Sequence, residues 1–203
     1  CRMKSPVDFA KRVTEDFYDP LIKRSITRKK RIPTMVYGHT DGKNWRRNAT
    51  ANDKRHYSQI VKKITSISPP IKSIIWGDLY RAGYHTGITH LHHFYTHRNF
   101  LAIASLWQAI EDEPSELRDA LRLLVLSYNS SHSTLMTRVV VKKGQKDFVL
   151  TGAQSGVLYI SGLPVEKNVF RGLRRKSRTL KEAFSLVSGS KSTVNVQQAS
   201  STK

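Results

Sequence analysis

Three things are scarce in this sequence of 203 residues: cysteine, acidic side chains and long apolar runs. The single cysteine, Cys1, has no partner within the chain, which excludes a scaffold of internal disulfides and fits a reducing, intracellular setting. No stretch approaches the roughly 18 consecutive apolar residues that span a bilayer, so we expect no membrane partner. Hydrophobic residues still make up 38% of the chain, which indicates one folded domain or two small ones rather than a disordered basic tail.

The scarcity of acids leaves a large positive charge. The chain has 35 Lys and Arg residues against 15 Asp and Glu residues, which gives a formal charge of +20. Five of the acids lie within residues 111–119, so the other segments are more basic still. Basic runs are often solvated helix faces, but the lack of acidic partners here favours contact with nucleic acid. Charge alone does not distinguish DNA from RNA, and the binding that it provides depends on salt.

The spacing of apolar residues predicts an α+β fold, with a helical hairpin core, a small antiparallel sheet and a basic C-terminal helix. Helical spacing occurs in residues 52–64, 96–111, 115–128 and 165–187. We expect Asn52 to cap the first helix and Leu117 to lie on the core face of the third. Alternating spacing predicts strands at residues 136–142, 148–151 and 156–160.

The chain divides into three predicted parts. Residues 1–50 form a basic N-terminal arm or hairpin, residues 51–187 form the main domain, and residues 188–203 form a linker. Residues 6–21 suit a short helix or an irregular arm, whereas Asp41 and Gly42 predict a tight turn farther along. The sequence opens without an initiator Met or a signal sequence, so we expect it to be a fragment of a longer protein.

Three segments supply the expected contacts with nucleic acid, because guanidinium groups suit phosphate oxygens and the O6/N7 edge of guanine. The basic arm contributes Arg28, Lys29, Lys30, Arg31, Arg46 and Arg47. The histidine-rich loop contributes Arg81, His85, Thr86, His90, His97, Arg98 and Asn99. The C-terminal helix contributes Lys167, Asn168, Arg171, Arg174, Arg175 and Arg178. The spacing of the last four arginines places them on one helix face.

Five of the eight histidines lie within residues 85–97, and this segment has three interpretations. One is a metal site, since His93 follows His90 by three residues and precedes His97 by four, although no Cys or acid joins them within the segment. Another is that residues 93–95 pack as a cap before the apolar helix. The third is contact of the polar side chains with phosphates and bases. We expect a mixture of the last two.

The sequence lacks the motifs of common catalytic sites. It has no Gly-rich phosphate loop followed by Lys-Ser/Thr and no Gly-x-Ser-x-Gly elbow. It also has no Asp-Pro-Pro-aromatic tetrapeptide and no Phe-x-Gly-x-Gly turn. We therefore expect no catalytic residue, bound cofactor or metal in this chain.

Three separated runs carry a resemblance to a known family. They are YRAGYHTGITHLHHFYTHRNFLA at residues 80–102, LSYNSSHSTLMTR at residues 126–138 and GVLYISGLPVEKN at residues 156–168. In this order they resemble the central portion of bacterial adenine-specific DNA methyltransferases, the modification methylases. The similarity covers most of residues 70–203 and is weaker before that.

The resemblance implies a role for the chain. In that family the half that binds S-adenosylmethionine lies before this region, often near a Cys-rich zinc knuckle, and the Asp-Pro-Pro-Phe motif follows a stretch similar to residues 195–202. Residues 51–187 would then be a target-recognition domain that binds double-stranded DNA in the bacterial cytoplasm, beside the flanking catalytic segments of the parent chain. S-adenosylmethionine would be a cofactor of the parent enzyme and not of this fragment.

Two other predictions compete with this one. The domain could be an interdomain scaffold or a module that binds RNA or protein, with its positive face turned to that partner. It could also be a small metal-dependent enzyme, which requires zinc bound by the histidine segment.

Overall fold

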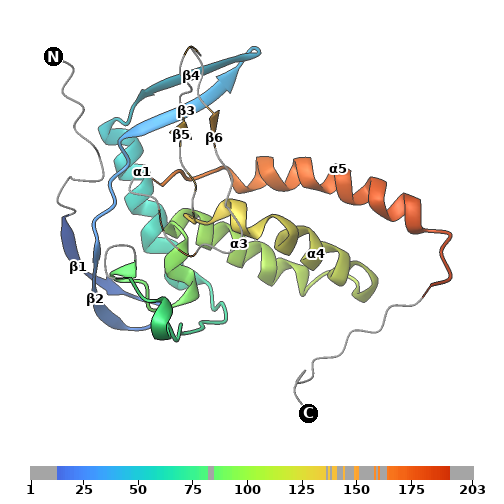
Figure 1. The fold of residues 1–203 in the computed structure, drawn as a ribbon, viewed down its shortest axis with the longest axis horizontal. Helices are drawn as coiled ribbons and strands as arrows, with labels where there is room; N and C mark the ends of the chain where they lie inside the picture. The colour runs from blue at the N-terminus through green and yellow to red at the C-terminus, as the bar shows by residue number, and fades with distance from the viewer. Residues whose placement is uncertain are drawn as a thin grey trace.

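The computed structural model confirms the α+β class (Figure 1). It describes residues 13–81, 85–135, 137, 139–140, 144, 149–150, 158, 160 and 164–192. Within these residues the strands form three separate antiparallel pairs rather than one sheet. None of the helices in the described residues has the length and apolarity needed to cross a membrane.

The basic arm contains two hairpins. In the first, β1 (Thr14–Asp19) pairs with β2 (Arg24–Lys29), so the residues expected to be helical or irregular are a strand from Thr14 onward. In the second, β3 (Met35–Thr40) pairs with β4 (Lys43–Asn48). The predicted turn between these strands is confirmed, because Asp41 and Gly42 both adopt positive φ, 50° and 73°.

The first helix, α1 (Ala51–Lys62), follows the second hairpin directly. Its N-cap is Thr50 rather than the predicted Asn52. The Thr50 side chain accepts a hydrogen bond from the Asp53 backbone, and the Asp53 carboxylate accepts one from the Thr50 backbone in return. This reciprocal capping box fixes the start of α1 shortly after the end of β4. A 3-10 turn, η2 (Lys63–Ser66), ends the helix and buries Ile64.

The predicted helical hairpin is confirmed as α3 (His97–Ile110) and α4 (Ser115–His132). The two helices pack together, and the side chain of Thr96 caps the first of them. Two 3-10 turns, η3 (Gly77–Leu79) and η4 (Leu91–Phe94), precede it. The expected core position of Leu117 is wrong, because its side chain is 50% exposed in the first turn of α4.

The sheet predicted after the helical hairpin is only partly described. Strand β5 (Val139–Val140) pairs with β6 (Val149–Leu150), within two of the predicted strands. Leu135 forms an isolated bridge with Ile160. Most of the third predicted strand, residues 156–160, and residues 193–203 of the predicted linker lie outside the described residues.

The C-terminal helix, α5 (Val169–Val187), starts four residues later than predicted, after the N-cap Asn168. It packs along α4, with Val169 and Leu173 buried (Figure 1). Gly172 permits this approach, since a Cβ there would lie only 2.5 Å from the Tyr128 ring. The later part of α5 extends beyond this contact.

The histidine-rich loop itself contributes to the hydrophobic core. Ile88, Phe94 and Ile160 form the buried cluster, and half-buried hydrophobic residues pack against it. These are Ile74, Trp76, Tyr95 and Leu135. The burial of Phe94 confirms the expected cap before the apolar helix.

Candidate nucleic-acid interface

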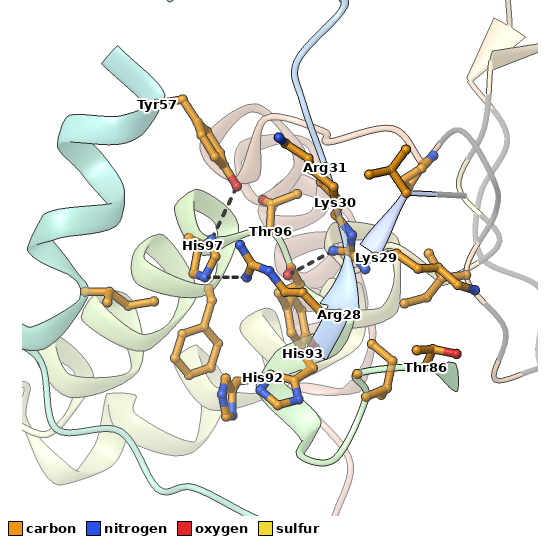
Figure 2. Close-up of a pocket in the computed structure, with 18 residues that line it drawn as sticks. Arg28, Lys29, Lys30, Arg31, Tyr57, Thr86, His92, His93, Thr96 and His97 are labelled. Carbon is orange, nitrogen blue, oxygen red and sulfur yellow. Dashed lines mark hydrogen bonds between the residues drawn. The ribbon is translucent and has the colours of Figure 1, made fainter. Parts of the chain in front are cut away.

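A basic cavity of about 180 Å³ lies between the end of β2, helix α1 and the start of α3 (Figure 2). The consecutive basic residues 28–31 form one of its walls, and Tyr57 from α1 forms another. Thr86, Thr96 and the histidines 92, 93 and 97 also line it. The structure therefore brings together residues of the basic arm and of the histidine-rich loop around one cavity.

Arg28 joins β2 to the hairpin partner strand and to α3. Its Nε donates a hydrogen bond to Glu15 Oε1 at 3.0 Å, and its guanidinium lies 3.3 Å from the centre of the Phe17 ring. Its Nη1 lies 3.4 Å from Nε2 of His97. The charge of Arg28 is thus largely engaged by groups of the protein itself.

Arg31 and Lys30 differ from Arg28 in having no carboxylate partner among the described residues. Arg31 is half-buried, and among the described residues its guanidinium donates one long hydrogen bond, of 3.5 Å, to the Tyr95 carbonyl. Burial, and to a lesser degree the neighbouring Arg28, lower the pKa of Arg31. Lys30 is exposed at the mouth of the same cavity.

His97 lies between Arg28 and Tyr57 at the first position of α3 (Figure 2). Its Nδ1 lies 3.4 Å from the Tyr57 hydroxyl. Burial, followed by repulsion from Arg28, lowers the pKa of His97 to about 4. Burial and the negative charge of Glu166 raise the pKa of Tyr57. Both groups are therefore neutral at pH 7, and the positive charge of the cavity comes from the Lys and Arg residues.

Beneath the cavity, a buried carboxylate holds two adjacent histidines. Oδ2 of Asp19, a residue only 3% exposed, accepts hydrogen bonds of 2.7 Å from Nε2 of both His92 and His93. Burial alone would raise the pKa of Asp19, but these bonds and a bond from the Leu21 amide lower it well below its usual range. This cluster ties the β1–β2 hairpin to η4.

The same three residues have the composition of a metal site, since one ligand atom of each lies within 4.8 Å of the others. The hydrogen bonds of His93 argue against that role. Its Nδ1 accepts from the backbone N–H groups of Thr89 and His90, at 3.1 and 3.3 Å, so Nε2 carries the proton of the neutral ring. A ligand atom would need its lone pair there. We conclude that the cluster is a hydrogen-bonded anchor.

Two other members of the histidine-rich loop serve the fold. His85 is buried, stacks on Trp76 with ring centres 4.0 Å apart, and contacts the backbone through both ring nitrogens. Asn99 is also buried and donates to the carbonyls of His132 and Lys167. We therefore leave His85 and Asn99 out of the interface, because neither side chain is available to a phosphate.

The remaining predicted residues of this loop lie nearer the surface. Arg81 donates to the carbonyls of two preceding residues, and Arg98 forms an ion pair with Glu166. His90 is half-buried, and its Nδ1 lies 2.9 Å from the Thr89 hydroxyl. Thr86 lines the basic cavity.

The β3–β4 hairpin projects above α1 and carries two of the predicted arginines (Figure 1). Every residue of β4 is exposed. Arg47 makes a two-pronged ion pair with Asp53, at 2.6 and 3.0 Å, whereas Arg46 faces solvent. The Trp45 ring covers Gly38 on the opposite strand, where a Cβ would lie 2.0 Å from it. The hairpin is thus an exposed basic ribbon with an ordered aromatic side chain.

The C-terminal helix presents the third basic surface. Arg171, Arg174, Arg175 and Arg178 are all exposed on α5. The guanidinium of Arg175 also donates to the Tyr128 hydroxyl and lies over that ring. Lys167 is half-buried, and burial lowers its pKa. The Asn168 side chain accepts from the Arg171 amide as the N-cap, so its oxygen is engaged.

Sequence reasoning missed Asp19 and Tyr57 in this region. Asp19 precedes His92 by 73 residues and Tyr57 precedes His97 by 40, and neither pair belongs to a local motif. A single sequence holds no signal that joins such distant residues, since they meet only through the packing of the hairpin and α1 on the loop.

The chain was also compared with protein-family models, with curated proteins and with solved structures, and none of these comparisons found a match.

Proposed function

We propose that this chain binds double-stranded DNA as the target-recognition region of an adenine-specific DNA methyltransferase. The observation that supports DNA binding most strongly is the imbalance of charge on the surface. Among the described Lys and Arg residues, Arg28, Arg47, Arg98 and Arg122 form ion pairs with described carboxylates. The whole chain has 35 Lys and Arg residues against 15 Asp and Glu residues, and such an excess of cations attracts a polyanion.

The shapes of two basic elements suit a duplex. The major groove of B-DNA admits either an α-helix or a two-stranded β-ribbon. Helix α5 has 19 residues with exposed arginines at 171, 174 and 178, and the β3–β4 ribbon has 6 residues in each strand. We assign phosphate contacts to both and expect some of the α5 arginines to reach base edges.

The assignment to a methyltransferase depends on the resemblance of residues 80–102, 126–138 and 156–168. In this proposal the methyl transfer, S-adenosylmethionine and the Asp-Pro-Pro-Phe motif belong to flanking segments of the parent enzyme. The chain described here would position the duplex for them. Adenine must leave the base stack to be methylated, so the module would also hold a distorted duplex.

A salt titration of duplex binding tests the proposal. We would measure the affinity for a 30-base-pair duplex by fluorescence anisotropy, comparing the unaltered chain with Arg174→Gln/Arg178→Gln. The control is Arg118→Gln/Arg122→Gln, which removes the same charge from α4. If both α5 arginines contact phosphates, the slope of log K against log salt should shrink by about two in the test variant alone. An equal decrease of this slope in the two variants would refute the assignment of phosphate contacts to the arginine face of α5.

A specific observation also supports the scaffold alternative. The last turns of α5 expose apolar side chains, with Phe184 43%, Val187 59% and Leu186 87% exposed. An apolar helix end of this kind suits packing against another protein surface, such as a flanking catalytic segment. Duplex binding that is weak at physiological salt, together with loss of association with those segments in Phe184→Ser, would favour this second function.

A further inference from the structure

We infer that the basic cavity beside Arg31 is a binding site for a phosphate group, and that in the working protein this phosphate belongs to the backbone of a nucleic-acid strand. This inference rests on the proposed function and adds a specific site to it. The proposed function assigns DNA contacts to exposed surfaces, whereas this site is enclosed by β2, α1 and the start of α3 (Figure 2).

The first argument is an uncompensated charge. Arg31 is half-buried with one long hydrogen bond to a carbonyl, so most of its N–H donors have no partner in the described protein. A partly buried guanidinium without a counter-ion is unfavourable, because its desolvation is not offset by attraction to an anion. Such a group beside a cavity is therefore prepared for an anionic ligand.

The second argument is that the nearby carboxylates are already engaged. Glu15 pairs with Arg28, and Glu166 pairs with Arg98. Asp19 accepts hydrogen bonds from two histidines beneath the cavity. None of the described residues that line the cavity is acidic. An internal ion pair with Arg31 is thus absent from the described residues, which leaves its guanidinium open to an anionic ligand.

The third argument concerns the type of anion. The cavity, at about 180 Å³, is several times the roughly 30 Å³ that one liquid water occupies, which leaves room for a tetrahedral oxyanion. The N-terminus of the 14-residue helix α3 reaches it at Thr96 and His97, where the helix dipole adds to the positive potential. Arg31 offers the forked donors that phosphate oxygens prefer, and Lys30 stands at the mouth.

Gly87 lines the cavity and packs against Arg28. It has a φ of +79°, and a Cβ there would lie 2.5 Å from Cβ of Arg28. The close approach of this glycine to β2 packs the histidine-rich loop against the basic residues. Replacing Gly87 would therefore disturb the cavity together with the backbone, so the decisive variants alter side chains instead.

The test uses four probes with the whole chain: inorganic phosphate, deoxyadenosine 5′-monophosphate, deoxyadenosine and a duplex. The test variant is Lys30→Gln/Arg31→Gln. The matched control is Lys54→Gln/Arg55→Gln, which removes the same charge from exposed positions of α1. Binding is measured by isothermal titration calorimetry, and the melting temperature of each protein is recorded with and without phosphate.

We expect phosphate and the nucleotide to bind the unaltered chain and to raise its melting temperature. The test variant should lose about tenfold or more of that affinity, as expected for loss of charged hydrogen bonds, while the control keeps it. Without ligand, the test variant should melt no lower than the unaltered chain, because it loses an unpaired cation. A variant that retains the charge, Arg31→Lys, should bind phosphate with intermediate affinity.

The outcomes separate the site from the proposed function. Equal binding of deoxyadenosine and its 5′-monophosphate, or equal phosphate binding by test variant and control, would overturn the site even if salt-dependent duplex binding persists. If phosphate binds in the cavity but the test variant keeps its affinity for the duplex, the bound phosphate does not come from a nucleic-acid strand. The site would then bind a free phosphorylated ligand. Phosphate binding without any duplex binding would refute the proposed function and support the site alone.

Discussion

Asp19→Asn should be among the most damaging single substitutions in this protein. Asp19 is 3% exposed, and one of its oxygens accepts hydrogen bonds from His92 and His93. Its other oxygen accepts from the Leu21 amide at 2.9 Å. Asparagine has one oxygen and one NH₂ group, so in either orientation the NH₂ group faces an N–H donor.

The expected cost follows from the bonds that are lost. A hydrogen bond to a charged group contributes roughly 1.5–3 kcal/mol, and burial leaves any abandoned donor unsatisfied. If the amide oxygen of the asparagine still accepts the hydrogen bonds on one side, from the histidines or from Leu21, we expect a loss of about 2–5 kcal/mol in the free energy of unfolding. That is a large share of the roughly 5–15 kcal/mol typical of folded proteins.

Urea denaturation followed by circular dichroism measures this loss. Asp16→Asn is the control, since Asp16 lies on the same strand but is exposed. It should change stability by no more than about 0.5 kcal/mol. The low pKa of Asp19 also predicts that the unaltered protein loses stability as pH falls below the unfolded carboxyl value near 4, and that the variant loses less. A cost below about 1 kcal/mol for Asp19→Asn would refute the role of the cluster as an anchor.

Three further predictions concern other parts of the chain. His97 and His132 have pKa values lowered to about 4, so between pH 4 and 6.5 the unfolded state binds more protons than the folded state. The free energy of unfolding, measured by chemical denaturation, should therefore rise with pH across that window by up to about 3 kcal/mol per group. Asn99→Leu should cost roughly 2 kcal/mol in the same assay, because the buried His132 carbonyl and the partly buried Lys167 carbonyl lose their donor. Gly38→Ala should displace Trp45 and speed hydrogen exchange in the β3–β4 hairpin while leaving exchange in α3 unchanged.

Local sequence patterns predicted the elements that depend on local physics. The apolar spacing of α3 and α4 and the Asp-Gly turn were sufficient for the helical hairpin and the β3–β4 turn. The cap of α1 was misassigned because Thr50 and Asn52 are both good capping residues, and only the reciprocal bond with Asp53 selects Thr50. Leu117 fits the helical pattern, but its side chain is half exposed in the first turn of α4.

The candidate site was less accessible to sequence reasoning. The basic residues 28–31 were expected to bind an anion, but their enclosure in a cavity depends on α1 and the histidine-rich loop packing against β2. His85 and Asn99 were selected by their polarity, and their burial follows from tertiary contacts that polarity does not reveal. The anchor at Asp19 joins residues 73 positions apart, for which the chain has no local signal.

The central claim is that this chain recognises duplex DNA, and selection from a random pool of duplexes tests it most directly. We would incubate the chain with the pool at physiological salt, recover the bound duplexes over several rounds and sequence them. The account predicts a consensus that includes an adenine, and weaker enrichment of that consensus by Arg174→Gln/Arg178→Gln than by Arg118→Gln/Arg122→Gln. Recovered duplexes with the same base composition as the starting pool would contradict sequence recognition by this chain.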